Sequence, residues 1–308
     1  MGLLNAALMG LLNAALFLVN LALCYGRRVY SRHHAANTGN PVYLRIIPIT
    51  FLLALTACNQ QPEQAAAGSE PASESKTAAS SIYRDAVAHP NRRSADHDRD
   101  AGRKPAEVLA FFGIGSGMTV LDMFSGGGYY SELLSIVVGP EGKVVAHSNA
   151  AYLGFAGDEF KERYADGRLA NVDVLMAENN ELELPGEEFD AVTLMLSYHD
   201  FFYVDAENGW PKIDGPKLLA EIYKGMKPGT VMGVVDHFAE AGSPRETGNS
   251  VHRIDPGIVI SELEIAGFVL DGTSDVLRNM DDDYSKSVFD PELRGKTDRF
   301  VLRFRKPR

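Results

Sequence analysis

Cysteine is nearly absent from this chain of 308 residues, which contains only Cys24 and Cys58. Everything beyond Cys58 lacks a thiol, so disulfide bonds, zinc–thiolate sites and cysteine nucleophiles are excluded there. Acidic residues are absent from the first 57 positions, which carry four arginines and no lysine. All 41 Asp and Glu then oppose the remaining 26 Lys and Arg, a net charge near −15 beyond Cys58. This charge disfavours a polyanionic partner such as nucleic acid.

Two apolar segments lie in the basic N-terminal region. Residues 3–23 form a run long enough to cross a bilayer, which takes ~20 residues, and the octet MGLLNAAL occurs twice within residues 1–16. Further on, Arg45, an apolar stretch at residues 46–55 and the ending Leu55-Thr56-Ala57-Cys58 follow the order of a secretory signal. The ending resembles the bacterial lipobox, in which the cysteine is lipidated and becomes the new N-terminus.

The lipobox predicts a signal or membrane segment at residues 1–57, a lipidated Cys58 with a tether at residues 58–81, and a domain at residues 82–308. The tether is mainly Gln, Ala, Ser, Glu and Pro, with little to bury. The predicted location is the periplasmic side of a bacterial cell envelope, and Asn59 in place of aspartate favours the outer membrane. The alternatives are one anchor at residues 3–23 with a chance cysteine, and a start near Val42 or Leu44 that makes residues 1–41 a start-site artefact.

The stretch TVLDMFSGGGYY at residues 119–130 joins a strand pattern to a helix pattern through a glycine-rich turn. Strand, glycine turn and helix together bring backbone N–H groups close to a ligand in α/β domains. A phosphate-binding loop would avoid the carboxylate of Asp122 at the end of the strand, whereas a ligand with an ammonium group would favour it. The amino-acid end of S-adenosylmethionine (SAM) is such a ligand.

Strand and helix patterns alternate beyond this turn and predict a Rossmann-like, doubly wound α/β fold with a mostly parallel sheet. Strands are predicted at residues 118–124, 143–147, 172–177, 189–196, 231–235, 268–270 and 300–304. Helices are predicted from Lys104 onward and at residues 129–138, 158–164, 216–226 and 257–266. Ligands of such folds bind outside the carboxyl ends of the strands, so candidate chemistry lies just after each strand.

The pieces VLDMFSGGGYY, FDAVTLML and MKPGT stand in the order and spacing of class I SAM-dependent methyltransferases, which the chain resembles over roughly residues 100–306. The piece GYYSELLSIVVGPEGKVVAHS is also similar to the protein-repair carboxyl methyltransferase subgroup. HDRDAGRKPAEVL, together with the lipobox, resembles uncharacterised bacterial predicted methyltransferases. The resemblance implies a seven-stranded sheet and SAM as cofactor. Two positions depart from it: Phe124 replaces the first glycine, and Ser148 and Asn149 replace the acid that holds the ribose hydroxyls.

The candidate cofactor-binding residues follow the first four predicted strands and are Asp122, Ser125, Gly126, Gly127, Gly128, Asn149, Glu178, Asn179 and Ser197. The candidate catalytic residues are His199 and Asp200 after the fourth strand, and His237 after the fifth. A His–Asp pair can accept a proton from a hydroxyl or amine nucleophile; the alternative is a buried, hydrogen-bonded histidine. No metal site is predicted, because exposed charge before a helix explains His97 and the aspartates around it.

Two other residues stand near the predicted site. His252 precedes the last helix and could line a substrate pocket, and Trp210 is predicted to anchor a surface loop over the end of the fourth strand. The predicted function is a SAM-dependent methyltransferase that acts on a small molecule or protein by His-assisted, in-line methyl transfer. The alternative is a tethered, methyltransferase-like binding module that has lost catalysis, which the departures at Phe124 and Asn149 favour.

Overall fold

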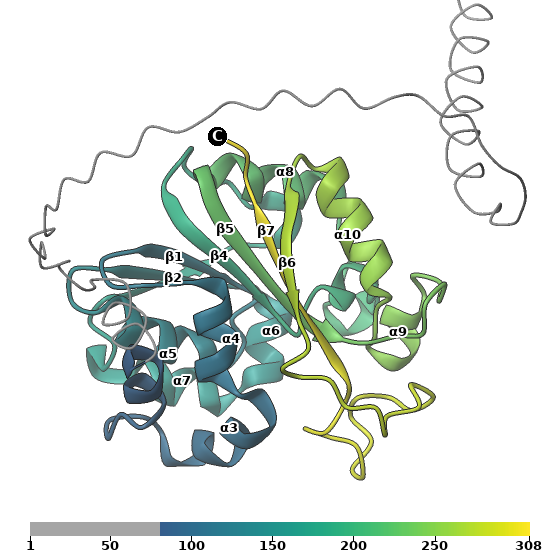
Figure 1. The fold of residues 1–308 in the computed structure, drawn as a ribbon, viewed down its shortest axis with the longest axis horizontal. Helices are drawn as coiled ribbons and strands as arrows, with labels where there is room; N and C mark the ends of the chain where they lie inside the picture. The colour runs from purple at the N-terminus through teal and green to yellow at the C-terminus, as the bar shows by residue number, and fades with distance from the viewer. Residues whose placement is uncertain (1–80) are drawn as a thin grey trace, which may run out of the picture. The chain divides into compact units, whose positions relative to one another are not determined.

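The computed structural model describes residues 81–308 (Figure 1). The predicted signal segment, Cys58 and the tether up to residue 80 lie outside the described residues. Residues 81–87 are helical. Between residues 81 and 308, no helix combines the length and the apolar character that crossing a membrane requires.

Seven strands form one sheet in the order β3-β2-β1-β4-β5-β7-β6. In chain order they are β1 (Thr119–Met123), β2 (Lys143–Ser148), β3 (Val172–Met176), β4 (Phe189–Met195), β5 (Met226–His237), β6 (Val269–Ser274) and β7 (Arg299–Arg305). The pairs from β3 to β5 are parallel, whereas β7 is antiparallel to β5 and β6. The predicted Rossmann-like, mostly parallel, seven-stranded sheet is confirmed. The strand order reverses at β1, which puts β2 and β4 on either side of it.

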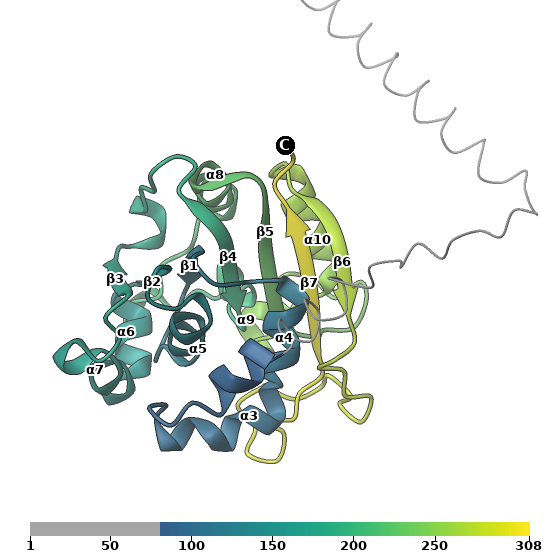
Figure 2. The ribbon, with the colours of Figure 1, turned by 60° about the vertical axis from the view of Figure 1, so that its left-hand side comes forward.

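Helices cover both faces of the sheet (Figures 1 and 2). α4 (Pro105–Phe112) and α5 (Tyr129–Val138) pack on one face, and α8 (Gly215–Gly225) and α10 (Pro256–Ile265) on the other. Val120 of β1 belongs to the core under α4 and α5, whereas its neighbour Leu121 belongs to the core under α8 and α10. Because successive side chains of a strand point to opposite faces, β1 contributes apolar side chains to both cores, and Asp122 is a buried polar exception near its end.

Capping side chains fix where the helices of the second face begin. The Asp255 carboxylate accepts a hydrogen bond from Gly257 N at 2.8 Å, with Pro256 at the first helical position of α10, as predicted. Asp214 caps α8 by accepting from Lys217 N at 3.2 Å. The remaining α-helices are α3 (His97–Arg103), α6 (Ala150–Ala156), α7 (Asp158–Tyr164) and α9 (Thr247–Val251).

Several elements differ from the prediction. The helix at residues 81–87 and the helices α3, α6 and α9 were not predicted, and β5 and β6 have different bounds. β5 begins at Met226 rather than near residue 231, so the predicted Lys-Pro-Gly turn lies inside the strand. The strand tolerates Pro228 because the register between β4 and β5 shifts between Phe189 and Ala191, which interrupts the ladder there. α6 begins because Asn149 Oδ1 accepts a hydrogen bond from Tyr152 N at 2.9 Å.

Candidate active site

The glycine-rich turn after β1 adopts a backbone that side chains disfavour. Phe124, Gly126 and Gly128 have φ of 52°, 55° and 75°, in the left-handed region. Glycine adopts these dihedral angles without steric strain, whereas for other residues they cost roughly 1–2 kcal/mol of conformational energy. Phe124 therefore adopts this left-handed backbone at an energetic cost. Its ring offsets that cost by packing 5.1 Å from the ring of Tyr152 and 5.9 Å from that of Phe201.

The turn offers unused hydrogen-bonding groups. In the part of the chain that the structure describes, the N–H groups of Gly126 and Gly127 donate no hydrogen bond. A Cβ added to Gly126 would meet only Tyr152 Cδ1 at 3.9 Å and Phe124 O at 4.0 Å, so the space beside this residue is open. Two free N–H groups at the start of α5 form a site for a carboxylate.

Four buried side-chain oxygens lie at the carboxyl ends of β1 to β4 without a hydrogen bond of acceptable geometry among the described residues. They are Ser125 Oγ, Ser148 Oγ, Asn179 Oδ1 and Ser197 Oγ. A buried polar atom without a partner costs about 1–3 kcal/mol, and such atoms are rare in folded proteins. Their clustering at four successive strand ends fits a polar ligand that lies across this edge of the sheet. We refer to these four residues, with Gly126 and Gly127, as the strand-end site.

The opposite side of the glycine turn is held by a buried charge network. Arg163 of α7 is fully buried, and its Nε donates to Gly127 O at 2.7 Å. Its guanidinium also bonds Asp96 and Glu132. Burial opposes ionisation of Asp96, but hydrogen bonds from Arg163 and Arg99 outweigh it and lower the pKa of this carboxyl to about 2. The expectation that the charges around His97 are simply exposed is wrong for Asp96, because it is the counter-ion that anchors Arg163.

Asp122 is 1% exposed, and its carboxylate accepts hydrogen bonds from Ser131 Oγ at 2.6 Å and Thr193 Oγ1 at 2.8 Å. Burial raises its pKa to about 6, although both hydroxyls lower it. Asp122 thus ties β1 to α5 and β4, and both of its hydrogen bonds go to the protein. A direct contact with a ligand's ammonium group stays a prediction.

Some residues after β2 and β3 already form hydrogen bonds within the protein, and others have side-chain oxygens that do not. Asn149 Oδ1 caps α6, so this oxygen is already engaged. Glu178 Oε1 accepts from Ala150 N at 3.2 Å and holds the same helix start. Ser148 and Asn179 keep free oxygens, as described above. A contact to ribose hydroxyls is therefore better supported for Ser148 and Asn179 than for Asn149, whose structural role the sequence did not reveal.

His199 lies between two carboxylates, one from its own loop and one from the neighbouring strand. Its Nδ1 is 2.7 Å from Asp236 Oδ1, its backbone N–H donates to Asp236 Oδ2 at 2.8 Å, and its Nε2 is 3.2 Å from Asp200 Oδ1. Burial opposes a charge on the ring, but Asp200 and Asp236 raise the pKa of His199 to about 10. The ring is therefore protonated at neutral pH in this arrangement. The predicted His199–Asp200 pair exists, and Asp236, which precedes His237 at the end of β5, is a third member that was not among the predicted site residues.

The other two histidines at this edge have different surroundings. His237 is buried, its Nδ1 lies 2.7 Å from Thr297 Oγ1, and burial together with the nearby Arg299 lowers its pKa well below the usual value. His252 follows α9 and places its Nδ1 3.8 Å from Asp200 Oδ1. The ring of His199 lies 5.8 Å from that of His237 and 5.4 Å from that of His252. Three histidines from separate segments thus meet, with His199 close to each of the other two.

Aromatic side chains surround this cluster. The Tyr152 hydroxyl donates to Asp200 Oδ2, and the Tyr152 ring lies 5.2 Å from that of Trp210. Trp210 also lies 5.4 Å from Tyr203, while its backbone pairs with Asp205. Trp210 therefore sits beside the end of β4, where it was predicted. The Phe289 ring, 43% exposed, contacts His252 at 4.8 Å, so the outer rim of the cluster is apolar.

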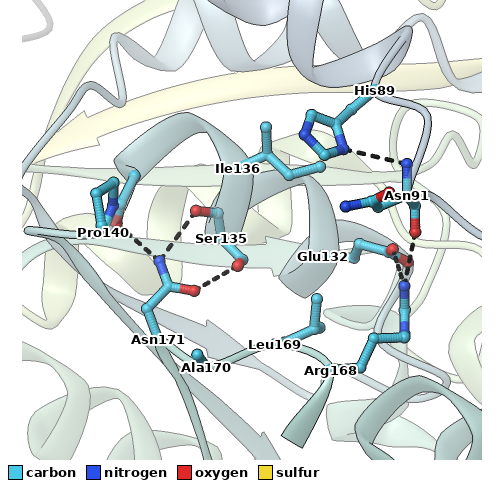
Figure 3. A pocket seen from close by; sticks show the side chains of 11 residues that line it. His89, Asn91, Glu132, Ser135, Ile136, Pro140, Arg168, Leu169, Ala170 and Asn171 are labelled. Carbon is cyan, nitrogen blue, oxygen red and sulfur yellow. Dashed lines mark hydrogen bonds and ion pairs between the residues drawn. The ribbon is translucent and has the colours of Figure 1, made fainter.

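A separate cleft of about 710 Å³ lies on the far side of α5 (Figure 3). It is lined by polar side chains that already bond one another: Arg168 donates to Glu132 at 2.6 Å, and Asn171 Nδ2 donates to Ser135 O at 3.0 Å. None of the predicted site residues lines this cleft. Because its polar groups are satisfied, the strand-end site remains the better candidate for a ligand.

Comparison with known proteins gives relatives over part of the chain. No family model matches the chain. The ubiquinone/menaquinone biosynthesis C-methyltransferase UbiE of Pseudomonas aeruginosa is 33% identical over 99 residues, which are 32% of this chain and 38% of the relative. The UbiE protein of Pseudomonas putida is likewise 33% identical over 100 residues. The chain thus spans about two-fifths of the length of these curated relatives, and their full activity does not transfer with the match.

Solved structures share the general architecture at low similarity. A SAM-dependent methyltransferase from Aquifex aeolicus is 26% identical with a TM-score of 0.48, covering 68% of this chain and 93% of that protein. An arsenic(III) S-adenosylmethionine methyltransferase from Chlamydomonas reinhardtii is 18% identical with a TM-score of 0.45, covering 74% and 73%. The fold assignment rests on the sheet topology described above.

Proposed function

We propose that this protein is a SAM-dependent methyltransferase that acts on a small-molecule or protein acceptor. The observation that carries the proposal is the set of unpaired groups at the strand-end site. Two N–H groups of the glycine turn and the oxygens of Ser148 and Asn179 lack partners at this edge of the sheet. The hydroxyls of Ser125 and Ser197 lie near those of Tyr164 and Tyr152 without a hydrogen bond of good geometry. The strand order reverses at β1, and such a reversal is where doubly wound sheets bind ligands. SAM carries a carboxylate, an ammonium group, ribose hydroxyls and an adenine, which would satisfy groups of this kind.

Each part of the cofactor would contact different residues of the strand-end site. Gly126 and Gly127 would hold the methionine carboxylate through their N–H groups. Ser148 and Asn179 would bond the ribose hydroxyls, and Ser125 and Ser197 would receive polar groups near the ends of β1 and β4. When bound, SAM supplies an electrophilic methyl group on a sulfonium, so the protein mainly aligns the nucleophile and removes its proton.

His199 and Asp200 are the residues we propose to assist the acceptor. They follow β4, next to Ser197 of the strand-end site. His199 Nε2 lies 3.2 Å from Asp200 Oδ1 and would have to give up this contact to orient the acceptor's nucleophilic atom by a hydrogen bond. It would accept the acceptor's proton only as a neutral ring. Because the ring is protonated at neutral pH in this arrangement, orientation is the larger contribution. His237 is the second candidate, and its neutral ring is the observation in its favour.

Calorimetric titration of the full chain with SAM and with its demethylated product tests this proposal. We expect both to bind, and we expect the aromatic residues around Tyr152 to change their fluorescence on binding. Absence of binding heat with either ligand at millimolar concentration would remove the enzyme proposal. It would leave the alternative of a methyltransferase-like binding module, whose ligand would then have to satisfy the same unpaired groups.

We also propose, on the lipobox at residues 55–58, that the chain is a lipoprotein anchored on the periplasmic side of a bacterial envelope through Cys58. SAM is made in the cytosol, so this location requires a route by which the cofactor reaches the domain. The proposal concerns residues outside the described part of the chain and is tested separately from cofactor binding.

A further inference from the structure

We propose that His199, Asp200 and His252 form a binding site for a divalent first-row transition-metal ion, with zinc as the reference ion. One ligand atom from each residue lies within 4.8 Å of the other two. Asp200 Oδ1 is the shared centre, 3.2 Å from His199 Nε2 and 3.8 Å from His252 Nδ1. This metal site goes beyond the proposed function, and metal binding can be measured without SAM or an acceptor.

Coordination requires the three ligand atoms, which lie within 4.8 Å of one another, to move closer together. Zinc binds histidine nitrogen and carboxylate oxygen at about 2.0–2.2 Å, which places neighbouring ligand atoms about 3.0–3.5 Å apart in octahedral or tetrahedral geometry. The contact between His199 and Asp200 is already in that range. The contact of His252 is a few tenths of an ångström too long, and His252 follows a short helix at the rim rather than a strand of the core.

The residues behind the proposed ligands fix their orientation. Asp236 Oδ1 holds His199 Nδ1 at 2.7 Å, which leaves Nε2 to face Asp200. Tyr152 donates its hydroxyl to Asp200 Oδ2, which leaves Oδ1 for the shared position. A carboxylate behind a ligating histidine, and a hydrogen bond behind a ligating carboxylate, are the usual supports of metal ligands. The same pattern appears here on two of the three residues.

The local charge also favours a cation, which in the metal-free chain is the proton that Asp200 and Asp236 stabilise on His199. A metal ion would have to replace this proton, because a ligating imidazole is neutral. Asp200 and Asp236 are both buried, and within residues 81–308 neither forms an ion pair with a lysine or arginine. Their partners are histidines and a tyrosine. Two histidines and one carboxylate leave coordination positions open, as in catalytic rather than structural zinc sites. The side chain of His252 is 18% exposed, against 5% for His199, so His252 is the more exposed of the two proposed histidine ligands.

The bound ion would determine which chemical class of methyl acceptor the protein uses. This consequence rests on the proposed function. The cluster lies just after β4, where we place the acceptor. An acceptor with a hydroxyl or carboxyl oxygen would coordinate the ion and lose its proton to solvent. In the transfer step the oxygen–carbon bond forms, the sulfonium–methyl bond breaks, and the sulfonium becomes a neutral thioether. With the ion bound, His199 acts as a ligand rather than as a proton acceptor.

Equilibrium dialysis of the metal-free full chain against zinc tests the site, with cobalt(II) as a spectroscopic substitute. We expect one zinc ion per chain at this site, in addition to any zinc that the N-terminal residues bind. We also expect cobalt absorption bands typical of coordination by nitrogen and oxygen. His252→Ala should weaken zinc binding at least tenfold, and circular dichroism should show that this rim substitution leaves the fold intact. Asp200→Asn should have the same effect.

Two controls separate this site from other histidines. His97→Ala removes an exposed histidine of α3, and a His33→Ala/His34→Ala double variant removes the adjacent pair outside the described residues. Both should leave the cobalt spectrum of the site unchanged. Zinc binding that is absent from the wild-type chain, or equal in wild type and His252→Ala, overturns the metal site. A failed SAM titration in a chain that binds zinc would instead count against the proposed function alone.

Discussion

Asp236 on β5 binds His199 twice, through the backbone N–H at 2.8 Å and through the ring Nδ1 at 2.7 Å. One carboxylate thereby fixes both the position of the loop after β4 and the orientation of the imidazole that it carries. β4 and β5 are neighbouring parallel strands, so their carboxyl ends bring the two residues together although they are far apart in the sequence. The candidate chemistry of this protein depends on that pairing.

Substitution of His199 should separate catalysis from cofactor binding. We expect His199→Ala to lower turnover ~100-fold or more, in the range usual for loss of a group that handles the acceptor's proton. SAM affinity should change little, because the strand-end site does not include this ring. Product formation, screened first over envelope small molecules and proteins, measures the effect, with His97→Ala as the control. Unchanged turnover would make His199 structural and move the proposed role to His237.

A larger side chain at position 126 of the glycine turn should weaken SAM binding. Gly126→Val places a branched side chain in the open space beside Tyr152 and adds strain at a φ of 55°. We expect SAM binding to weaken at least tenfold, which corresponds to about 1.4 kcal/mol. Gly113→Val is the matched control, since Gly113 has a φ of 72°, has nothing within 4 Å of an added Cβ and lies at the end of α4. Equal affinities of the two variants for SAM would contradict the placement of the cofactor.

Asp122 should make stability fall as pH rises from about 4 to 6. Its pKa is 3.8 by reference and is raised to about 6 in the folded protein. Between these values the folded state keeps a proton that the unfolded state has lost, so raising the pH favours unfolding. The full penalty, present above pH 6, is up to about 3 kcal/mol.

The Asp122→Asn variant lacks this carboxyl group, so nothing at position 122 titrates between pH 4 and pH 6. Chemical denaturation of both proteins at pH 4 and pH 7 should show that the variant gains stability relative to wild type at the higher pH. A difference in unfolding free energy between the two proteins that stays constant over this range would show that Asp122 does not titrate there.

Lipidation should depend on the second cysteine and not on the first. In a bacterial host, Cys58→Ala should abolish acylation and leave a precursor of higher mass, because the cysteine is the site of both modification and cleavage in a lipobox. Cys24→Ala should be processed like the wild type. Mass spectrometry of the mature protein measures both outcomes, and an unmodified N-terminus upstream of residue 58 in the wild type would rule out the lipoprotein.

The sequence by itself determined the order of the strands and helices, and with it the sheet. The apolar runs at β1 and β4 and the caps at Asp255 and Gly128 are local signals, since hydrophobic pattern and turn chemistry act over a few neighbouring residues. The same signals located His199 and Asp200 just after β4. The boundaries of β5 were predicted less well, because the strand continues across an interruption of its ladder with β4, and this interruption accommodates Pro228.

Only the tertiary structure decided which side chains share a partner. Asp96, which looks like exposed charge in the sequence, is buried because Arg163 folds back against it from α7 and needs a counter-ion. Asn149, which looks like a ligand group, is engaged because it caps a helix that sequence patterns did not reveal. Asp236, Asp200 and His252 surround one imidazole because parallel strands end at the same edge of the sheet. Such contacts join residues from separate elements, and their geometry is set by how the layers pack rather than by any local pattern.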